Sequence, residues 1–120
     1  MIRKKIINFD RVRQIDGGFS FIPHRFLTDG FFTSLNQPEL LLYFFLVLAA
    51  DKNGLSYYSY ERICKFIDME LHEYLRARDG LLNKDLIVFN NTLFQVLELP
   101  AKPKATSDIG SLIKKSLKEA

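Results

Sequence analysis

The chain has little of the residues from which most catalytic and metal sites are built. Its 120 residues include only two histidines, one cysteine (Cys64) and no tryptophan. One cysteine excludes an intramolecular disulfide, and zinc sites use several Cys or His ligands that this sequence does not group together. Glycine-rich phosphate loops and the Gly-X-Ser-X-Gly nucleophile motif are also absent. We therefore expect Cys64 to be a structural thiol, with no catalytic residues, metal, cofactor or enzymatic activity.

Long hydrophobic runs are missing too. The longest apolar run, LLLYFFLVLAA, covers residues 40–50 and has 11 residues, whereas a membrane-spanning helix needs about 20. We expect a helix that is apolar on every side, buried by its own domain or by a second subunit, and no membrane partner. The basic N-terminus is not followed by the apolar stretch of a secretory signal, which predicts a cytoplasmic protein.

Positive charge is concentrated at the two ends of the chain. Residues 1–13 carry five cations against Asp10, a net +4, and residues 101–120 carry five lysines against two carboxylates, a net +3. Because the whole chain is +3, residues 14–100 must be −4. The expected phosphate-binding cations are therefore mainly in these arms: Arg3, Lys4, Lys5, Arg11, Arg13, Lys102, Lys104, Lys114, Lys115 and Lys118.

The pattern of apolar residues predicts a mostly helical α+β domain. Asn36 or Gln37 should begin a helix that runs to about Ala50, and a strand is expected at 55–58. Ser59 is a good N-cap for a helix to about Ile67, with Ile63, Phe66 and Ile67 facing inward. The remaining expected elements are a helix at 70–83, a hairpin of strands 86–89 and 92–99 turning at Asn90-Asn91, and an amphipathic helix at 109–120.

This order of elements resembles a known group of proteins. The segment PELLLYFFLVLAADKNGLSYYSYERICKFIDMELHEYLRARDGLLNKDLIVF, residues 38–89, is similar to the winged helix-turn-helix domains of plasmid and primosomal replication initiators and mobile-element proteins. The resemblance covers about residues 19–99 and implies a DNA-binding fold with a C-terminal β-hairpin wing. We divide the chain into a basic arm (1–18), the winged domain (19–99), and a linker with a short basic helix (100–120).

Helix 70–83 would be the DNA-reading helix of such a domain. Its six residues within about 120° on a helical wheel are expected to be buried: Leu71, Tyr74, Leu75, Arg78, Leu81 and Leu82. Arg78 would then pair with a carboxylate such as Glu61 or Asp68, or else contact a phosphate. The residues expected to read bases are His72, Glu73 and Arg76, where a carboxylate at 73 suits cytosine N4.

Other candidates for contact with the DNA backbone come from the preceding helix and the wing. Aromatic and basic side chains alternate before and within helix 59–67, a pattern that suits a nucleic-acid backbone. The tyrosines also fit an alternative role, in which one fills the core and the others cover the edge of the sheet. The candidates are Tyr57, Tyr60, Arg62, Lys65, Asn90 and Asn91.

Two functions remain open on the sequence alone. The first is a winged-helix protein that binds double-stranded DNA, as a transcriptional regulator or as an accessory factor in replication or of a mobile element. The second is a protein–protein interaction module that forms a homodimer or engages a replication or transposition protein. The negative charge of residues 14–100 favours the second function, whereas the basic arms favour the first.

Overall fold

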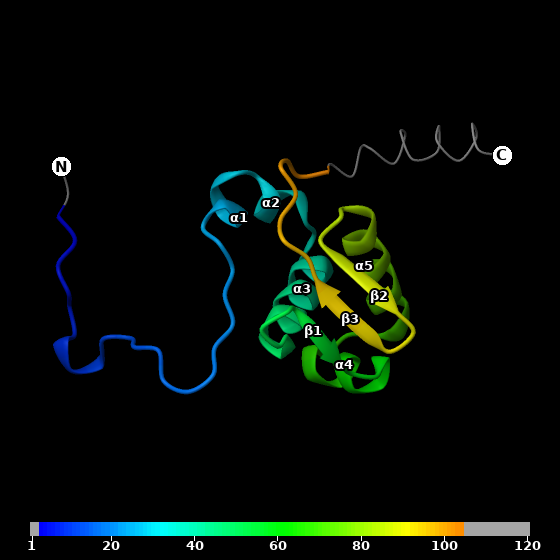
Figure 1. Cartoon of the computed structure of the whole chain (residues 1–120), viewed down its shortest axis with the longest axis horizontal. Coiled ribbons are helices and arrows are strands. Elements are labelled where there is room, and N and C mark those ends of the chain that lie inside the picture. Colours follow the sequence, from blue (N-terminus) through cyan, green and yellow to red (C-terminus); the bar gives the residue numbers. More distant parts are fainter. Residues whose placement is uncertain (1–2, 105–120) are drawn as a thin grey trace.

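The computed structural model describes residues 3–104, which form five α-helices and one three-stranded antiparallel sheet (Figure 1). The elements are η1 (Phe9–Arg11, a 3₁₀ turn), α1 (Arg25–Thr28), α2 (Phe31–Ser34), α3 (Gln37–Ala49), β1 (Leu55–Tyr57), α4 (Tyr60–Ile67), α5 (Leu71–Asn83), β2 (Ile87–Asn90) and β3 (Leu93–Val96). The predicted α+β class is confirmed, and the arrangement is compatible with a winged helix. The helix predicted at 109–120 lies outside the described residues.

Local capping chemistry explains where α3 begins. The Asn36 side chain accepts from the Glu39 backbone N–H at 2.9 Å, and the Glu39 carboxylate accepts from the Asn36 backbone N–H at 2.9 Å. Pro38 occupies the first turn, where its missing N–H costs no hydrogen bond. The predicted start is confirmed, and the reciprocal bonds satisfy two of the donors that every helix N-terminus leaves free.

A helix-turn-helix unit follows β1. Ser59 caps α4 by accepting from the Arg62 N–H at 3.3 Å, as its position in the sequence predicts. The turn after α4 is made by Asp68, whose φ of 52° lies in the left-handed region. Glu70 then caps α5 together with Glu73. The turn and both helices agree with the sequence prediction.

The sheet has the strand order β1-β3-β2. The predicted hairpin is present, but its turn is one residue later than expected, since Asn90 pairs with Leu93. The turn residues are therefore Asn91 and Thr92, and Asn91 supplies the positive φ of 56°. Gly54 lies at the other edge of β3, where its carbonyl oxygen accepts from the Val96 N–H. Its φ is 86°, and a Cβ there would overlap the Val96 carbonyl oxygen.

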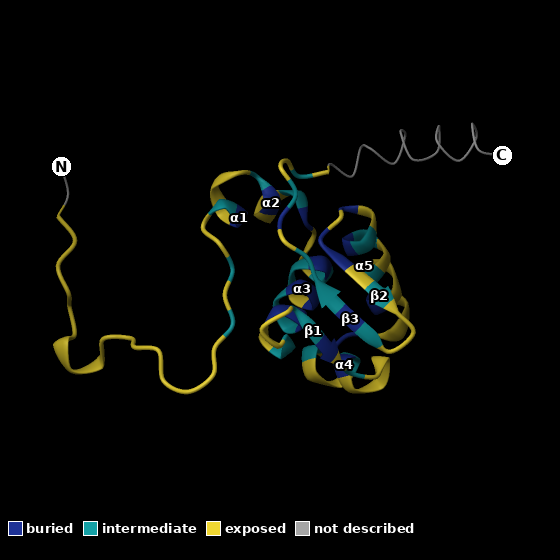
Figure 2. Cartoon of the chain, in the orientation of Figure 1, coloured by how far each residue is buried: buried dark blue, intermediate teal, exposed yellow. Residues whose placement is uncertain are grey.

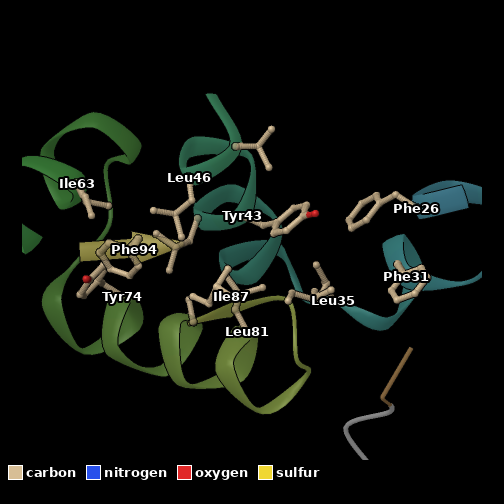
Figure 3. Packing of buried hydrophobic residues seen from close by; sticks show 14 of the residues in the cluster. Phe26, Phe31, Leu35, Tyr43, Leu46, Ile63, Tyr74, Leu81, Ile87 and Phe94 are labelled. Carbon is tan, nitrogen blue, oxygen red and sulfur yellow. The ribbon is translucent and has the colours of Figure 1, made fainter. Parts of the chain in front are cut away.

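Large side chains from α3, α4, α5 and the sheet meet in one core (Figure 3). Leu46 from α3, Ile63 from α4, Leu81 from α5 and Phe94 from β3 are completely buried. Tyr43 is also buried, and desolvation of its hydroxyl raises its pKa to about 12. The fully buried residues come from elements far apart in the chain, so the helix-turn-helix and the wing form one packed unit.

The short helices α1 and α2 extend this core with stacked aromatic rings. Phe26 stacks on Tyr43 with a centroid distance of 5.0 Å and on Phe31 at 6.3 Å. Arg25 in α1 donates to the Pro100 carbonyl oxygen at 2.7 Å, and its guanidinium lies over the Phe31 ring at 5.3 Å. The segment that leaves the sheet is thus attached to the helices that precede the domain.

A buried ion pair joins the start of α3 to the end of α5. Lys84 Nζ lies 2.7 Å from Glu39 Oε1 and donates to the Ser34 carbonyl oxygen at 2.9 Å. Both charged side chains are buried, so each depends on the other for compensation. Gly80 makes room for the pair, because a Cβ there would overlap Glu39 Oε2. The α3–α5 contact therefore requires a glycine in the middle of a helix.

One expectation about buried faces is wrong, and another is only partly tested. Phe66 does not face inward, because its side chain is 63% exposed whereas Ile63 is buried. Phe66 instead contacts Phe45 and Tyr58, with ring centroids 5.4 and 6.1 Å away. Helix α3 is not fully covered by its own domain, since Leu41 and Leu48 are exposed, with Leu48 at 76%; burial of these residues by a second subunit stays a prediction.

Substitution of Gly80 tests the α3–α5 contact. Helix propensity alone favours Gly80→Ala by about 1 kcal/mol. The added methyl displaces the Glu39 carboxylate, and loss of a partner for a buried charge costs about 3–5 kcal/mol. We expect a net loss of about 2 kcal/mol or more in urea unfolding. Gly18→Ala, with nothing within 4 Å of the new Cβ, should be neutral; a Gly80→Ala protein as stable as wild type would contradict the contact.

Asp51 gives the fold a defined acid sensitivity. Its Oδ1 accepts from the N–H groups of Asn53 at 2.8 Å and Leu55 at 2.9 Å, and these bonds lower its pKa. A lowered folded-state pKa means that the stabilisation is present above about pH 4 and is lost as the pH falls through that lower value. The difference in urea midpoint between wild type and Asp51→Ala should therefore shrink below pH 4. Asp16→Ala should show no such difference at any pH.

Candidate nucleic-acid interface

The outward face of α5 is mixed in chemistry. Its predicted reading residues His72 and Arg76 are exposed, and Asp79 lies one turn further on. The Glu73 carboxylate is only partly exposed and accepts from the Glu70 N–H at 3.4 Å, which completes the helix cap. Arg76 is therefore free to face a partner. His72 is exposed but its Nδ1 lies 3.4 Å from the Glu70 carboxylate, and Glu73 is engaged at the start of its own helix.

The buried face of α5 differs from the helical-wheel prediction. Tyr74 and Leu81 are buried as expected, but Leu71 and Leu75 are 47% and 37% exposed, and Ala77 is buried. The reason is the close approach of α3 to the small-residue side of α5, where Gly80 admits the Glu39 carboxylate. The buried stripe turns toward Ala77, which leaves two leucines on the surface beside His72 and Arg76.

Arg78 does not pair with either carboxylate that the sequence suggested. Its guanidinium lies 3.3 Å from the carboxylate of its neighbour Asp79 and 5.0 Å from the centre of the Phe89 ring in the wing. A second ring, Tyr74, is 6.0 Å away. The expected pairing with a carboxylate is present, but the partner is Asp79 rather than Glu61 or Asp68, because the hairpin packs over α5 and offers an aromatic face to the guanidinium. Arg78 links α5 to the wing.

The wing tip itself carries no positive charge. Asn90 and Asn91 are exposed at the hairpin turn, so both predicted backbone contacts are accessible. An amide side chain there can donate one hydrogen bond to a phosphate oxygen but adds no charge attraction.

Of the aromatic and basic candidates before and within α4, the structure brings Arg62 and Lys65 together. Tyr57 and Tyr60 are exposed, and the Arg62 guanidinium lies over the Tyr58 ring at 5.0 Å. Arg62 and Lys65 line a hollow together with Phe66, which sequence reasoning had placed in the core. The sequence could have indicated that Phe66 lies beside the two cations, because positions 62, 65 and 66 share one helix face.

The predicted N-terminal cations lie on an extended arm, defined here as residues 3–18. Figure 2 shows this arm exposed along its whole length and leading away from the folded domain. Within residues 3–104, none of Arg3, Lys4, Lys5, Arg11 and Arg13 forms an ion pair. In Figure 1 the arm and α5 lie on opposite sides of α3, so the structure does not gather the arm's charge beside the reading helix.

The C-terminal cations are only partly described. Lys102 and Lys104 are exposed, and Lys104 lies 3.9 Å from the Asp85 carboxylate. The other candidates, Lys114, Lys115 and Lys118, lie outside the described residues.

We also looked for a metal site, a reactive thiol and a membrane-spanning helix among residues 3–104. Among residues 3–104, no three His, Cys, Asp or Glu side chains are placed to bind a metal ion together. Burial raises the pKa of the Cys64 thiol, the opposite of the shift that activates a nucleophile. No helix in the described region is long and apolar enough to cross a membrane.

Substitution of the two arginines of α5 should change the free energy of unfolding by different amounts. Arg78→Ala removes the contact with the Phe89 ring and should lower the free energy of unfolding by about 1 kcal/mol. Arg76→Ala, its matched control on the exposed face, should change it by less than about 0.5 kcal/mol. Urea denaturation measures both values. Equal stabilities would show that Arg78 does not hold the wing to the helix.

Comparison with known proteins places the chain in no family. No protein-family model matches it, and no curated protein matches it. Among solved structures, the chain is similar to one described as "Structure of Rep-DNA complex", with 18% sequence identity and a TM-score of 0.48. The match covers 85% of this chain and 89% of that chain. At this level of similarity no function follows for this chain.

Proposed function

We propose that this protein binds double-stranded DNA, with α5 directed at the major groove and the basic arm along the backbone. The observation that carries the proposal is the arm: five exposed cations against Asp10 and Asp16 on a segment that extends from a domain with an exposed helix-turn-helix. Residues 14–100 carry a net charge of −4 and would be repelled by DNA on their own. The attraction must therefore come from the basic segments outside residues 14–100, which are the N-terminal arm and residues 101–120.

In this proposal the two parts do different work. The arm neutralises phosphates and releases counterions, which gives affinity without sequence preference. His72 and Arg76 on α5 would contact base edges, since an exposed arginine suits guanine O6 and N7. The biological setting that fits is transcriptional regulation, or an accessory role in replication or of a mobile element. This function needs no cofactor and no catalytic residue.

The alternative function is an interaction module, and one observation favours it. Leu41 and Leu48 on α3, Leu71 and Leu75 on α5, and several apolar arm residues are exposed. Surfaces of this kind commonly serve association. A homodimer is compatible with both functions, because two modules with few cations each gain affinity by binding together. Light scattering of the free protein distinguishes a dimer from a monomer.

Neutralising the arm tests DNA binding. The variant carries Ala at positions 3, 4, 5, 11 and 13, and the control carries Arg3→Lys, Arg11→Lys and Arg13→Lys, which keeps the charge. Five phosphate contacts predict a slope of log affinity against log salt of about −4.5, or a loss of roughly 500-fold between 50 and 200 mM salt. Fluorescence anisotropy with a generic duplex should show this slope for wild type and control, and a much smaller one for the neutral variant.

Two outcomes of this titration would contradict the proposal. One is no duplex binding by the intact chain at about 50 mM salt, where phosphate contacts are strong. The other is an unchanged salt slope after neutralisation of the arm. Either outcome would leave the interaction module as the better account of the exposed leucines.

A further inference from the structure

Helix α4 presents a surface to which the proposed duplex binding by α5 and the arm assigns no role. Arg62, Lys65 and Phe66 are spaced three and four residues apart and line an open hollow of about 380 Å³. Pockets that take small organic molecules have volumes of about 300–1,000 Å³. The hollow therefore has room for one group of modest size.

The Phe66 ring is held in place although most of its side chain is exposed. Its centroid lies 5.4 Å from that of Phe45 and 6.1 Å from that of Tyr58, and the contact with Tyr58 is edge-to-face. Phe45 and Tyr58 are themselves packed edge-to-face at 5.2 Å. Phe45 of α3 and Tyr58 of the loop before α4 thus fix the orientation of a ring that is 63% exposed, so little rotational entropy remains to be lost when a ligand stacks on it.

Two cations flank this ring without a carboxylate partner. The Arg62 guanidinium is positioned over Tyr58 at 5.0 Å. Within residues 3–104, neither Arg62 nor Lys65 forms an ion pair. An apolar protein partner that covered Phe66 would desolvate both charges with no compensation. A ligand that joins a flat aromatic group to phosphates satisfies the ring and the cations together.

We infer that this hollow binds an unpaired base of single-stranded DNA. The base stacks on Phe66, and the flanking phosphates pair with Arg62 and Lys65. Duplex DNA does not fit this site, because its bases are stacked inside the helix. The site is distinct from α5 and the arm, so the protein would bind paired and unpaired DNA through different surfaces.

A tryptophan in place of Phe66 reports on this site directly. The chain has no tryptophan, so Phe66→Trp introduces the only one, and a base stacked on the indole quenches its fluorescence. Titration of the full-length variant with a 12-nucleotide oligothymidine should quench the emission, whereas a blunt duplex of equal length should not. Leu48→Trp, at a position that is 76% exposed on α3, is the matched control and should not be quenched by either ligand. Equal quenching of the two variants would overturn the inference.

Substitutions at Phe66 separate stacking from simple apolar contact. Stacking of one base predicts a loss of about fivefold or more in affinity for oligothymidine on Phe66→Ala. Phe66→Tyr should retain affinity, and Phe66→Leu should lose it although it stays apolar. All three should bind duplex within about twofold of wild type. Should Phe66→Ala fail to fold by circular dichroism, the Leu and Tyr variants carry the test.

Other results would overturn the inference. The inference fails if Phe66→Leu binds oligothymidine with wild-type affinity. It also fails if Phe66→Ala keeps its affinity but shows a lower molar mass by light scattering, since this face would then be a protein interface. The two proposals can fail separately, because neutralising the arm should remove duplex binding and leave the quenching in Phe66→Trp unchanged. Quenching in a protein that does not bind duplex at all would support this site alone.

Discussion

The α3–α5 contact depends on one buried charge pair and on the missing side chain that makes space for it. Glu39 takes part in the cap of its own helix and also binds Lys84 at the end of α5. Since Gly80 lets the carboxylate approach, α5 packs with its small-residue side against α3. That rotation decides which residues reach the surface: Leu71 and Leu75 emerge beside His72 and Arg76. The composition of the outward face thus follows from an interaction on the opposite side of the helix.

The division of labour between domain and arm follows from charge. A domain with net negative charge preserves shape and orientation but does not attract phosphates. The arm has the opposite properties, since its cations are exposed and its backbone makes few contacts. In the functions proposed for this chain, affinity and orientation therefore come from different segments. The α4 surface adds a third element, where Arg62 and Lys65 are set beside an aromatic ring.

Much of the fold could be predicted from short-range signals. Asn36 with Pro38 and Ser59 at the start of α4 are caps that act within four residues, and the structure confirms them. Contacts between residues far apart in the chain could not be predicted from such local signals. The Glu39–Lys84 pair joins residues 45 positions apart, so neither partner is marked in its own neighbourhood. The exposed side of Phe66 and the ring beneath Arg78 depend likewise on which elements pack nearby, which periodicity alone does not specify.

The capping role of Glu73 has a consequence for how this protein could change over evolution. The first turn of α5 contributes one of its side chains to the cap, and Leu71 next to it carries no hydrogen-bonding group. The exposed polar positions of α5 that can vary without loss of the helix start are then 72, 76 and 79, one for each turn. Such a surface allows few combinations of side chains. New binding specificities would arise more readily in the arm, where no side chain holds the domain together.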